Sequence, residues 1–347
     1  MAQSRSKKTG ILAGGNWIVD HIKVIDQFPH QDGLSNIVNQ KLNTGGSPYN
    51  ILKNLSHLGA SFKLSGIGLV GEDNNGNYIL DDCIKSSIDK RGIKMLPGES
   101  TSFTDVLTVK STGRRTFLHQ KGVSSKLGTE YFRLEKYKAK IFHLGYLLLL
   151  DRLDSVNADA RTEASLLFQK ASEMGFKTSA DLVSEESERY RHVMASSLPF
   201  IDYLFLNTFD LEKLTETIIK ADGNISFRNM EEASLKLFDH GLREWVITEY
   251  KTGIFAMHAS GEKHIIGKAN LPLKEIAGQA GVSDAIAAAI LYGLHEGWEM
   301  PRSLELAACA VACCQTDVSC TEGILPLDMT LKKGRQWGFA ETGQNYI

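Results

Sequence analysis

The amino-acid sequence predicts an α/β fold in which a mostly parallel sheet is covered by helices on both faces. Short apolar runs that suit buried strands alternate along the chain with longer segments of helical periodicity. This alternation is typical of parallel sheets with helices on both sides. Two other segments alternate polar and apolar residues, as half-exposed strands do, and they predict a small β lid beside the main body.

The individual elements follow from local signals. Residues 11–15 form a short apolar run that ends in glycines, so we expect the first buried strand there. Ser47 and Pro48 favour the N-cap and the first turn of a helix, and Gly59 can end it. The same signals predict strands at 62–67, 141–144, 177–181, 203–206 and 245–248, and helices at 78–87, 155–174, 187–195, 211–220, 230–240, 284–295 and 303–315.

The lid is predicted from about 21–42 and 101–119, and it belongs to a single domain that spans 10–347. Residues 111–113 lie between two alternating runs and predict a hairpin turn. Arg114 and Arg115 follow that turn. They could contact a phosphate in a closed lid, but solvated turn charges are the favoured interpretation. The polar and basic residues 1–9 predict a disordered tail.

Composition excludes several classes of function. The chain has 347 residues, of which 42% are hydrophobic and 23% charged, which is ordinary for a globular protein. A formal net charge of -2 favours neither nucleic acid nor a membrane surface. The apolar runs are far shorter than the roughly 20 residues that cross a bilayer, and the start lacks a secretory signal. Five cysteines, an odd number, indicate a reducing compartment, so we expect a cytoplasmic protein.

Two glycine-rich clusters could approach a ligand closely. Gly45 and Gly46 lie at the start of a predicted helix, where backbone N–H groups are free, and Asn50 could present its amide to a hydroxyl. A plain loop-to-helix turn is the alternative. The second cluster, 66–76, could line a site or form a compact turn capped by Asp73. Asp181 ends a predicted strand, where we expect it to cap a loop.

A third cluster could carry phosphoryl-transfer chemistry. Gly281, Ser283 and Asp284 open the helix at 284–295, and the N–H groups of a first turn bind anions. Because the helix dipole favours negative charge there, we expect the Asp284 carboxylate to stay ionised and to act as a base toward an attacking hydroxyl. The alternative is an ordinary N-terminal helix charge.

In order and spacing these clusters resemble the ribokinase family of carbohydrate kinases, also called PfkB. The resemblance runs from about residue 11 to residue 326. Its most specific part is Gly45-Gly46 through Asn50 to Gly59, followed by Gly71, Asp73 and Gly76. The resemblance implies a ribokinase-like three-layer α/β/α sandwich with a mostly parallel central sheet and a small β-strand lid.

The resemblance also implies roles for individual residues on the sugar side. Asn16 and Asp20 fall where the family places a strand-end asparagine and a sugar-binding aspartate. Gly45, Gly46 and Asn50 complete the implied substrate site. Asp284 matches the catalytic base, with Gly281 and Ser283 forming the adjoining anion hole.

The donor side departs from the family pattern. Before the last catalytic helix the family reads Asp-Thr, one residue, then Gly-Ala-Gly-Asp, whereas residues 278–284 here retain only the first of those glycines and the base. The family's Asn-x-x-Glu appears as Asn207 to Asp210, which implies Asp210 as a magnesium ligand, with water filling the shorter reach. The family's Thr-x-Gly reads Thr248, Glu249, Tyr250, and Gly253 follows; Tyr250 would crowd the nucleotide or stack on its base.

These observations together predict ATP-dependent phosphorylation of a sugar or sugar-like hydroxyl, with Mg²⁺ and with a monovalent cation as a further candidate. Two alternatives stay open: a nucleoside kinase, and a catalytically silent or weakened sugar-binding or regulatory protein on the same scaffold. The expected partners are a sugar and a nucleotide. The lid strands could also pair between two copies in a homodimer.

Overall fold

The computed structural model describes residues 8–187, 189–221 and 224–342, and a nine-stranded sheet forms its centre. From β5 to β13 the neighbouring strands are parallel, and the last two are antiparallel. The order across the sheet is β15 (Lys263–Gly267), β14 (Gly253–His258), β13 (Trp245–Tyr250), β10 (Tyr203–Asn207), β9 (Lys177–Leu182), β8 (Ile141–Leu147), β1 (Ile11–Gly15), β4 (Leu64–Gly71) and β5 (Asp89–Leu96).

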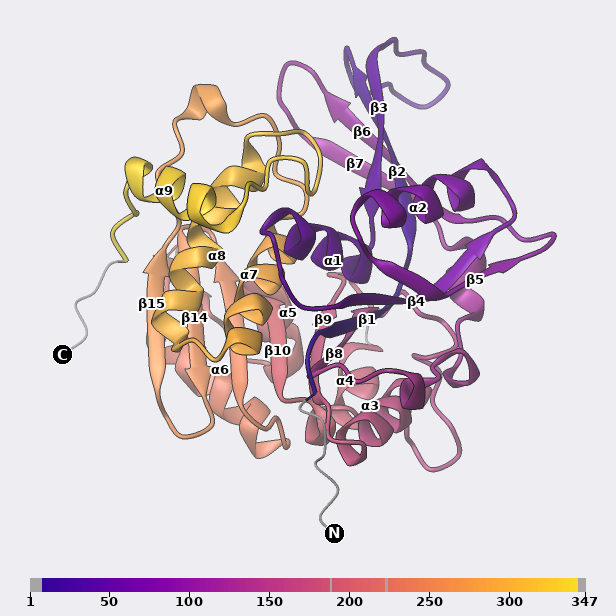
Figure 1. Ribbon diagram of the computed structural model, residues 1–347. Coiled ribbons are helices and arrows are strands. Elements are labelled where there is room, and N and C mark those ends of the chain that lie inside the picture. Colours follow the sequence, from indigo (N-terminus) through magenta and orange to yellow (C-terminus); the bar gives the residue numbers. More distant parts are fainter. Residues whose placement is uncertain (1–7, 188, 222–223, 343–347) are drawn as a thin grey trace.

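Helices cover both faces of this sheet (Figure 1). Alternate strand residues serve the two faces: Ile141 lies in one hydrophobic cluster, and Phe142 and Leu144 lie in the other. This arrangement confirms the predicted three-layer sandwich. One face carries α1 (Ser47–His57), α2 (Asn74–Lys85), α7 (Val282–Glu296) and α8 (Met300–Gln315), with α9 (Leu327–Trp337) packed on α8; the other carries α3 (Glu163–Glu173), α4 (Arg189–Ala195), α5 (Thr208–Thr215) and α6 (Phe227–Asp239).

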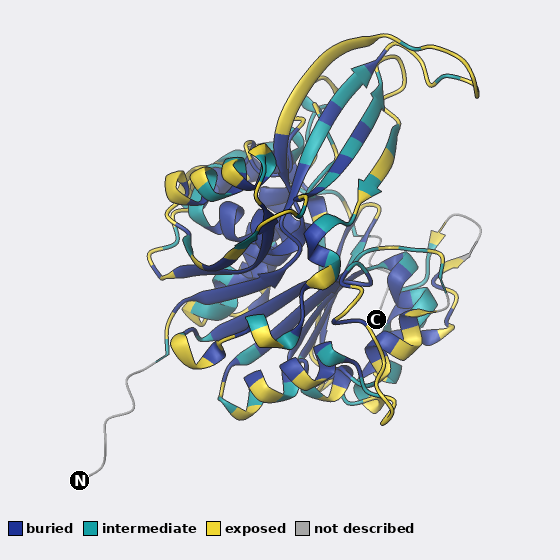
Figure 2. Cartoon of the chain, turned by 90° about the vertical axis from the view of Figure 1, so that its right-hand side faces the viewer, coloured by how far each residue is buried: buried dark blue, intermediate teal, exposed yellow. Residues whose placement is uncertain are grey.

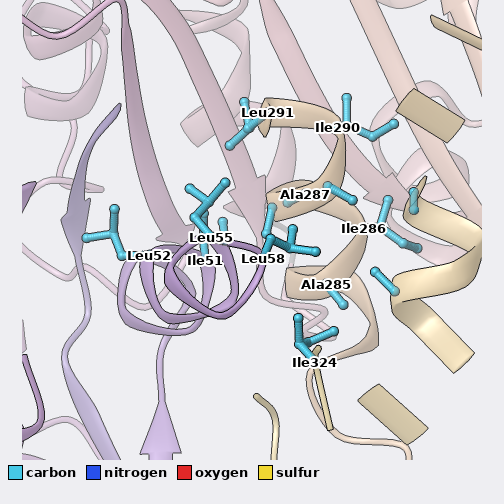
Figure 3. Close-up of a cluster of buried hydrophobic side chains, with 14 of the residues drawn as sticks. Ile51, Leu52, Leu55, Leu58, Ala285, Ile286, Ala287, Ile290, Leu291 and Ile324 are labelled. Carbon is cyan, nitrogen blue, oxygen red and sulfur yellow. The ribbon is translucent and has the colours of Figure 1, made fainter. Parts of the chain in front are cut away.

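The contact between α1 and α7 positions the site. Leu55 and Leu58 of α1 lie against the apolar side of α7 around Ala287 (Figure 3). Alanine side chains let the two helix backbones approach closely, and all these residues are fully or almost fully buried. The first turns of both helices are thereby held together, and the side chains that they carry can meet.

A four-stranded sheet forms the lid, in the order β3 (Ile37–Gly45), β2 (Ile18–Ile25), β6 (Ser102–Val109) and β7 (Arg115–Gln120). It projects from the body, and much of its surface is exposed (Figure 2). Strands β6 and β7 are antiparallel, with Thr108 opposite Arg115, which confirms the hairpin predicted at 111–113. The lid sheet leads directly into the body, since β3 ends at Gly45 and α1 begins at Ser47.

Two predicted helices have wrong boundaries. The helix at 155–174 begins only after Thr162, whose side chain accepts the Ser165 N–H as an N-cap. Before it, Asn157 forms a turn by accepting the N–H groups of Asp159 and Arg161, and this local bonding competes with a helix. The helix at 211–220 ends earlier, at Thr215, because the chain turns into the left-handed region at residue 216. Strand β11 (Lys220–Ala221) follows and pairs with β12 (Asn224–Ile225).

Several elements lie outside the predicted set. Strands β5, β14 and β15 and helix α9 had not been expected, nor had the short 3₁₀ segments. Most of the predicted tail, residues 1–7, lies outside the described residues, and the Thr9 N–H donates to the Lys138 carbonyl at 2.9 Å. Within the described ranges no helix has the length and apolarity needed to cross a bilayer. The 3₁₀ segments are Gly122–Lys126, Thr129–Tyr131, Leu134–Lys136, Leu198–Phe200 and Leu273–Glu275.

Candidate active site

A cavity of about 610 Å³ lies between the lid and the carboxyl ends of the central strands. The lid contributes Asp20 and Arg115, strand β9 contributes Asp181, strand β10 contributes Asn207, and the first turn of α7 contributes Asp284. The carboxyl ends of parallel strands are the usual place for ligands in open α/β sheets. This cavity is therefore the candidate active site.

Asp284 lies at the centre of the site and is 2% exposed. The Asn50 amide donates to its Oδ2 at 2.8 Å, and the Tyr146 hydroxyl donates to its Oδ1 at 2.7 Å. Burial, together with the nearby charge of Asp181, raises the Asp284 pKa to about 7, although both hydrogen bonds lower it. Burial therefore opposes the ionised form that the helix start had led us to expect.

Tyr146 and the charge of Asp181 are the parts of this network that sequence reasoning missed. Asp181 accepts the Ser47 hydroxyl at 2.6 Å, and the Nε2 atom of His143 lies 3.4 Å from its other oxygen. Asp181 and Asp284 both line the cavity. Asp181 therefore contributes charge to the site, and it is more than the loop cap that we expected. The available signal was the position of Tyr146 and Asp181 near the ends of two neighbouring strands, β8 and β9.

The sugar half, as the family resemblance assigns it, surrounds Asp20. Burial raises the Asp20 pKa to about 7, while a hydrogen bond from Thr104 and the charge of Arg115 lower it. A Cβ at Gly45 would lie 2.5 Å from Asp20 Oδ1, and one at Gly46 would collide with the Asn16 carbonyl. Only glycine lets the backbone at 45 and 46 come this close to Asp20 and Asn16.

Asn16 does not line the cavity, but its side chain holds the backbone next to it. Its Oδ1 accepts the Tyr146 N–H at 2.7 Å, and its side-chain amide donates to the Leu149 carbonyl. The structure thus brings Asp20, Gly46 and Asn50 to the cavity, while Asn16 and Gly45 hold neighbouring atoms in place.

An acidic side chain occupies the donor half, where the resemblance places phosphate. Glu249 accepts the Ser283 hydroxyl at 3.0 Å and pairs with Lys268 at 2.7 Å. All three line the cavity, as does Gly281, which precedes α7 with a left-handed φ of 75°. Sequence reasoning did not identify Lys268. A lone lysine in a loop carries no pattern that would have revealed it.

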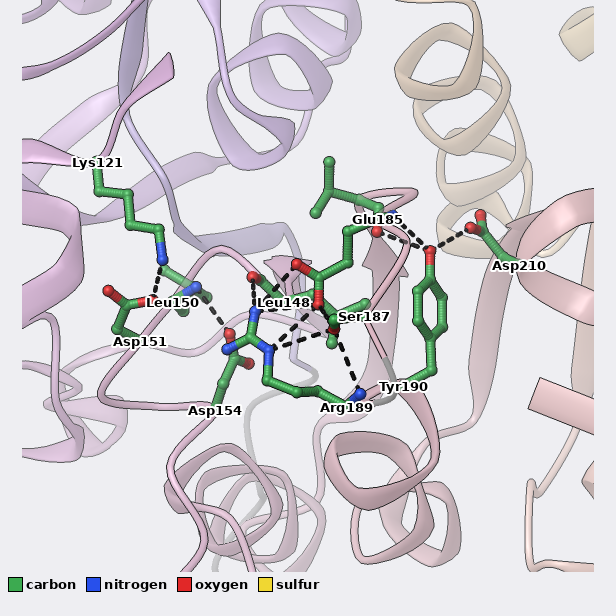
Figure 4. Close-up of polar contacts among 11 residues, drawn as sticks. Lys121, Leu148, Leu150, Asp151, Asp154, Glu185, Ser187, Arg189, Tyr190 and Asp210 are labelled. Atoms are coloured by element: carbon green, nitrogen blue, oxygen red, sulfur yellow. Dashed lines mark hydrogen bonds and ion pairs between the residues drawn. The ribbon is translucent and has the colours of Figure 1, made fainter. Parts of the chain in front are cut away.

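Asn207 and Asp210 form the N-terminal cap of α5. The Asp210 N–H donates to Asn207 Oδ1, and the Asn207 N–H donates to Asp210 Oδ2. Asp210 Oδ1 also accepts the Tyr190 hydroxyl at 2.9 Å (Figure 4). The Ser184 hydroxyl donates to the same oxygen at 2.8 Å. With its oxygens occupied in this way, Asp210 fits contact with a metal ion through water better than direct ligation.

Tyr250, Thr248 and Gly253 do not line this cavity, although Tyr250 lines a neighbouring cavity of about 570 Å³ together with Asn207 and Glu249. Tyr250 is 3% exposed and its ring packs 5.5 Å from that of Phe227, on the other face of the sheet from Glu249. Thr248 is fully buried, and a side chain at Gly253 would collide with the Tyr250 hydroxyl. The structure does not bring these residues to the cavity, because alternation along β13 turns Glu249 toward it instead.

The family to which this chain belongs, and the relatives it matches, make it a phosphotransferase that acts on a sugar. Residues 8–325 match the family described as pfkB family carbohydrate kinase, and the chain belongs to that family. Its relatives are sugar kinases with diverse named substrates. The chain is 25% identical over 333 residues to a 5-dehydro-2-deoxygluconokinase of Clostridium beijerinckii, with 92% of this chain and 90% of the relative covered. It is 28% identical over 208 residues to an ATP-dependent ribose-1-phosphate kinase of Halopiger xanaduensis, with 59% and 64% covered.

Solved structures share the fold. The ribokinase of Arabidopsis thaliana, complexed with ribose and ATP, matches with a TM-score of 0.76 at 16% identity, over 96% of this chain and 99% of that chain. The ribokinase of Giardia lamblia matches with a TM-score of 0.77 at 14% identity, over 93% and 98%. These likenesses confirm the ribokinase-like architecture.

Proposed function

We propose that this protein transfers the γ-phosphoryl group of ATP to a hydroxyl of a sugar or sugar-like molecule, with Asp284 as the general base. One observation carries the proposal: a buried carboxylate with a pKa of about 7 stands between the sugar half of the cavity and a free helix N-terminus. A base with a pKa near the operating pH is suited to accept the proton of an attacking hydroxyl.

The N–H groups of the first turn of α7 support the donor half of the proposal. They begin at Gly281 and need no particular side chain to bind phosphate oxygens. Lys268 could add a positive charge on the same side of the cavity. Magnesium would arrive with the nucleotide, held mainly by phosphate oxygens and water, with Asp210 in contact through water. Its role would be to neutralise charge on the phosphates.

The proposed acceptor is a sugar because Asp20, Gly46 and Asn50 meet at the lid side of the same cavity. The relatives named above act on a dehydrodeoxygluconate and on ribose 1-phosphate, by their names, and a structural neighbour binds ribose and ATP. Another structural neighbour is a nucleoside kinase of Burkholderia thailandensis in complex with inosine, so nucleosides belong among the acceptors to test.

One observation favours a weakened donor site as the second candidate. The Glu249 carboxylate lies at the Ser283 hydroxyl, where the negative charge of a donor phosphate would repel it. On this alternative the protein binds sugar and turns over slowly or not at all.

The test is ADP formation from ATP and Mg²⁺ with a panel of sugars, sugar acids, sugar phosphates and nucleosides. We expect turnover with at least one acceptor, and a loss of about 10²–10⁴ in the Asp284→Asn variant with sugar binding retained. Equal turnover in the variant would remove Asp284 from the mechanism. Sugar binding without turnover in the parent would favour the weakened scaffold.

A further inference from the structure

Strand β7 of the lid presents every second side chain to the cavity. Arg115, Phe117 and His119 all line it, as the two-residue period of a strand requires. Arg114 lies just before the strand and is exposed. The interpretation of both arginines as solvated turn charges is therefore wrong for Arg115, because the strand begins at this residue and turns it inward.

The Arg115 guanidinium faces the cavity without a partner. No carboxylate of the described residues lies within ion-pairing distance of it, and none of its N–H groups makes a hydrogen bond with them. Its guanidinium carbon lies 5.6 Å from the centre of the Phe117 ring. Burial lowers the Arg115 pKa, so the group is partly withdrawn from water. A guanidinium has five donors and no acceptor, and it remains charged, so this position calls for an anion.

Asp20 does not supply that anion. It acts on Arg115 only through longer-range charge, and burial raises its own pKa to about 7, so near neutral pH it is only partly ionised. A Thr104 hydrogen bond and the close approach of Gly45 hold it in its own position.

His119 adds a second polar group without a partner. Its Nδ1 shares a hydrogen bond with the Thr104 hydroxyl at 3.0 Å, while its Nε2 is buried and has no hydrogen-bond partner among the described residues. Arg115 and His119 are four residues apart on one face of β7, with Phe117 between them, so both face the same cavity.

We propose that the acceptor of this kinase carries an anionic oxygen group, a carboxylate or a phosphate monoester, and that Arg115 binds this group. The inference rests on the proposed function and names the class of its acceptor. Arg115 lies on the lid wall with Asp20, on the acceptor side, whereas Ser283 and Lys268 form the donor side. The planar fork of arginine suits the two oxygens of such a group.

The experiment compares related ligands with and without an anionic group: glucose, gluconate and glucose 6-phosphate, and ribose, ribonate and ribose 5-phosphate. Binding is measured by calorimetry in the presence of ADP and Mg²⁺, for the parent, Arg115→Met and Arg114→Met. The parent should bind an anionic member about 10- to 100-fold more tightly than its neutral partner. Arg115→Met should lose that preference, and the exposed neighbour Arg114→Met should keep it. The acid and phosphate arms identify which anion is preferred.

Three results would overturn the inference. The first is a parent that binds or phosphorylates neutral members as well as charged ones, which would leave the proposed function standing. The second is an Arg115→Met variant that keeps the preference for anionic ligands. If that variant only unfolds at a lower temperature, Arg115 serves as a structural counter-charge to Asp20. The third is an equal loss of kcat for neutral and charged acceptors, which would assign Arg115 to the transferred phosphoryl group. Binding of no ligand in any arm would overturn the proposed function as well.

Discussion

At the scale of single residues, the chemistry of the site depends on how the charge of Asp284 is balanced. Burial and the charge of Asp181 favour the protonated form, whereas Asn50 and Tyr146 donate hydrogen bonds that favour the ionised form. The result is a pKa of about 7, at which a small change in either direction alters the fraction of active base.

The pH profile of turnover tests this balance. A base must be ionised, so kcat/KM should fall as the pH drops through about 7. Tyr146→Phe removes one hydrogen bond to the carboxylate, so its pKa should rise and the fall should move to higher pH by about one pH unit. Tyr131→Phe, outside the cavity, is the control. A profile that stays in place in the Tyr146 variant would show that this hydroxyl does not set the ionisation of Asp284.

Asp284 should also reduce the stability of the fold. A carboxyl group whose folded-state pKa is raised favours folding while it is protonated, and this contribution is lost as the pH rises from the unfolded-state pKa through about 7. Asparagine can keep both hydrogen bonds, since its oxygen accepts from Asn50 and its N–H groups can donate to the Tyr146 hydroxyl.

We therefore expect Asp284→Asn to raise the unfolding temperature by about 2–4 °C at pH 8, with the difference shrinking toward pH 4. Scanning calorimetry at pH 8, 6 and 4 measures it. The other aspartates with raised pKa values, Asp20, Asp154 and Asp210, are common to both proteins, so their contributions cancel. A variant that unfolds at a lower temperature at pH 8 would contradict this account.

At the scale of elements, strand β13 determines what the donor phosphates would meet. Its alternation turns Glu249 to the cavity and Tyr250 to the opposite layer, against Phe227. Tyrosine at the third position of the family's Thr-x-Gly is thus accommodated by packing, and the carboxylate of Glu249 becomes the unusual feature of the donor half.

Glu249→Gln should tighten nucleotide binding by about tenfold, because it removes a negative charge beside Ser283 and releases Lys268. Lys268→Met should weaken binding. ATP and ADP titrations by calorimetry measure both effects, and Glu262→Gln in the exposed β14–β15 turn is the control for a simple change in net charge. If Glu249→Gln weakens ATP binding, the carboxylate assists the donor site, for example by contact with magnesium.

At the scale of the whole molecule, the lid leaves apolar side chains uncovered. Ile37, Val38 and Leu42 on β3 and Leu118 on β7 are all at least 50% exposed, and these two strands are the free edges of the lid sheet. Exposed edges with apolar side chains are a favourable surface for pairing with another chain. The homodimer through the lid stays a prediction, and these edges are where it would form.

Sedimentation should therefore show a dimer, and the double variant Val38→Lys, Leu42→Lys should sediment as a monomer. Ile84→Lys, on the exposed side of α2, adds a lysine at an apolar surface position away from the lid and should leave the dimer intact. A monomeric parent at micromolar concentration, or a dimer that survives the double variant, would place the lid outside any interface.

The sequence by itself determined the layers of this protein and the residues nearest to its chemistry. Alternating periodicities and turn signals reflect local free energies, so the layered α/β fold and the lid hairpin could be predicted from them, whereas the grouping of Gly46, Asn50 and Asp284 in one site came from the resemblance to the ribokinase family. Elements without a strong local pattern, such as β5 and α9, could not.

Only the tertiary structure decided which side chains meet in the cavity. Tyr146, Lys268 and the inward orientation of Arg115 and Glu249 depend on the pairing of strands that are far apart in the chain, and a shift of one residue would turn each of the two strand residues to the opposite face. The pKa of Asp284 was likewise beyond the sequence, because the helix dipole is local, whereas burial under α1 and the lid is a property of the assembled fold.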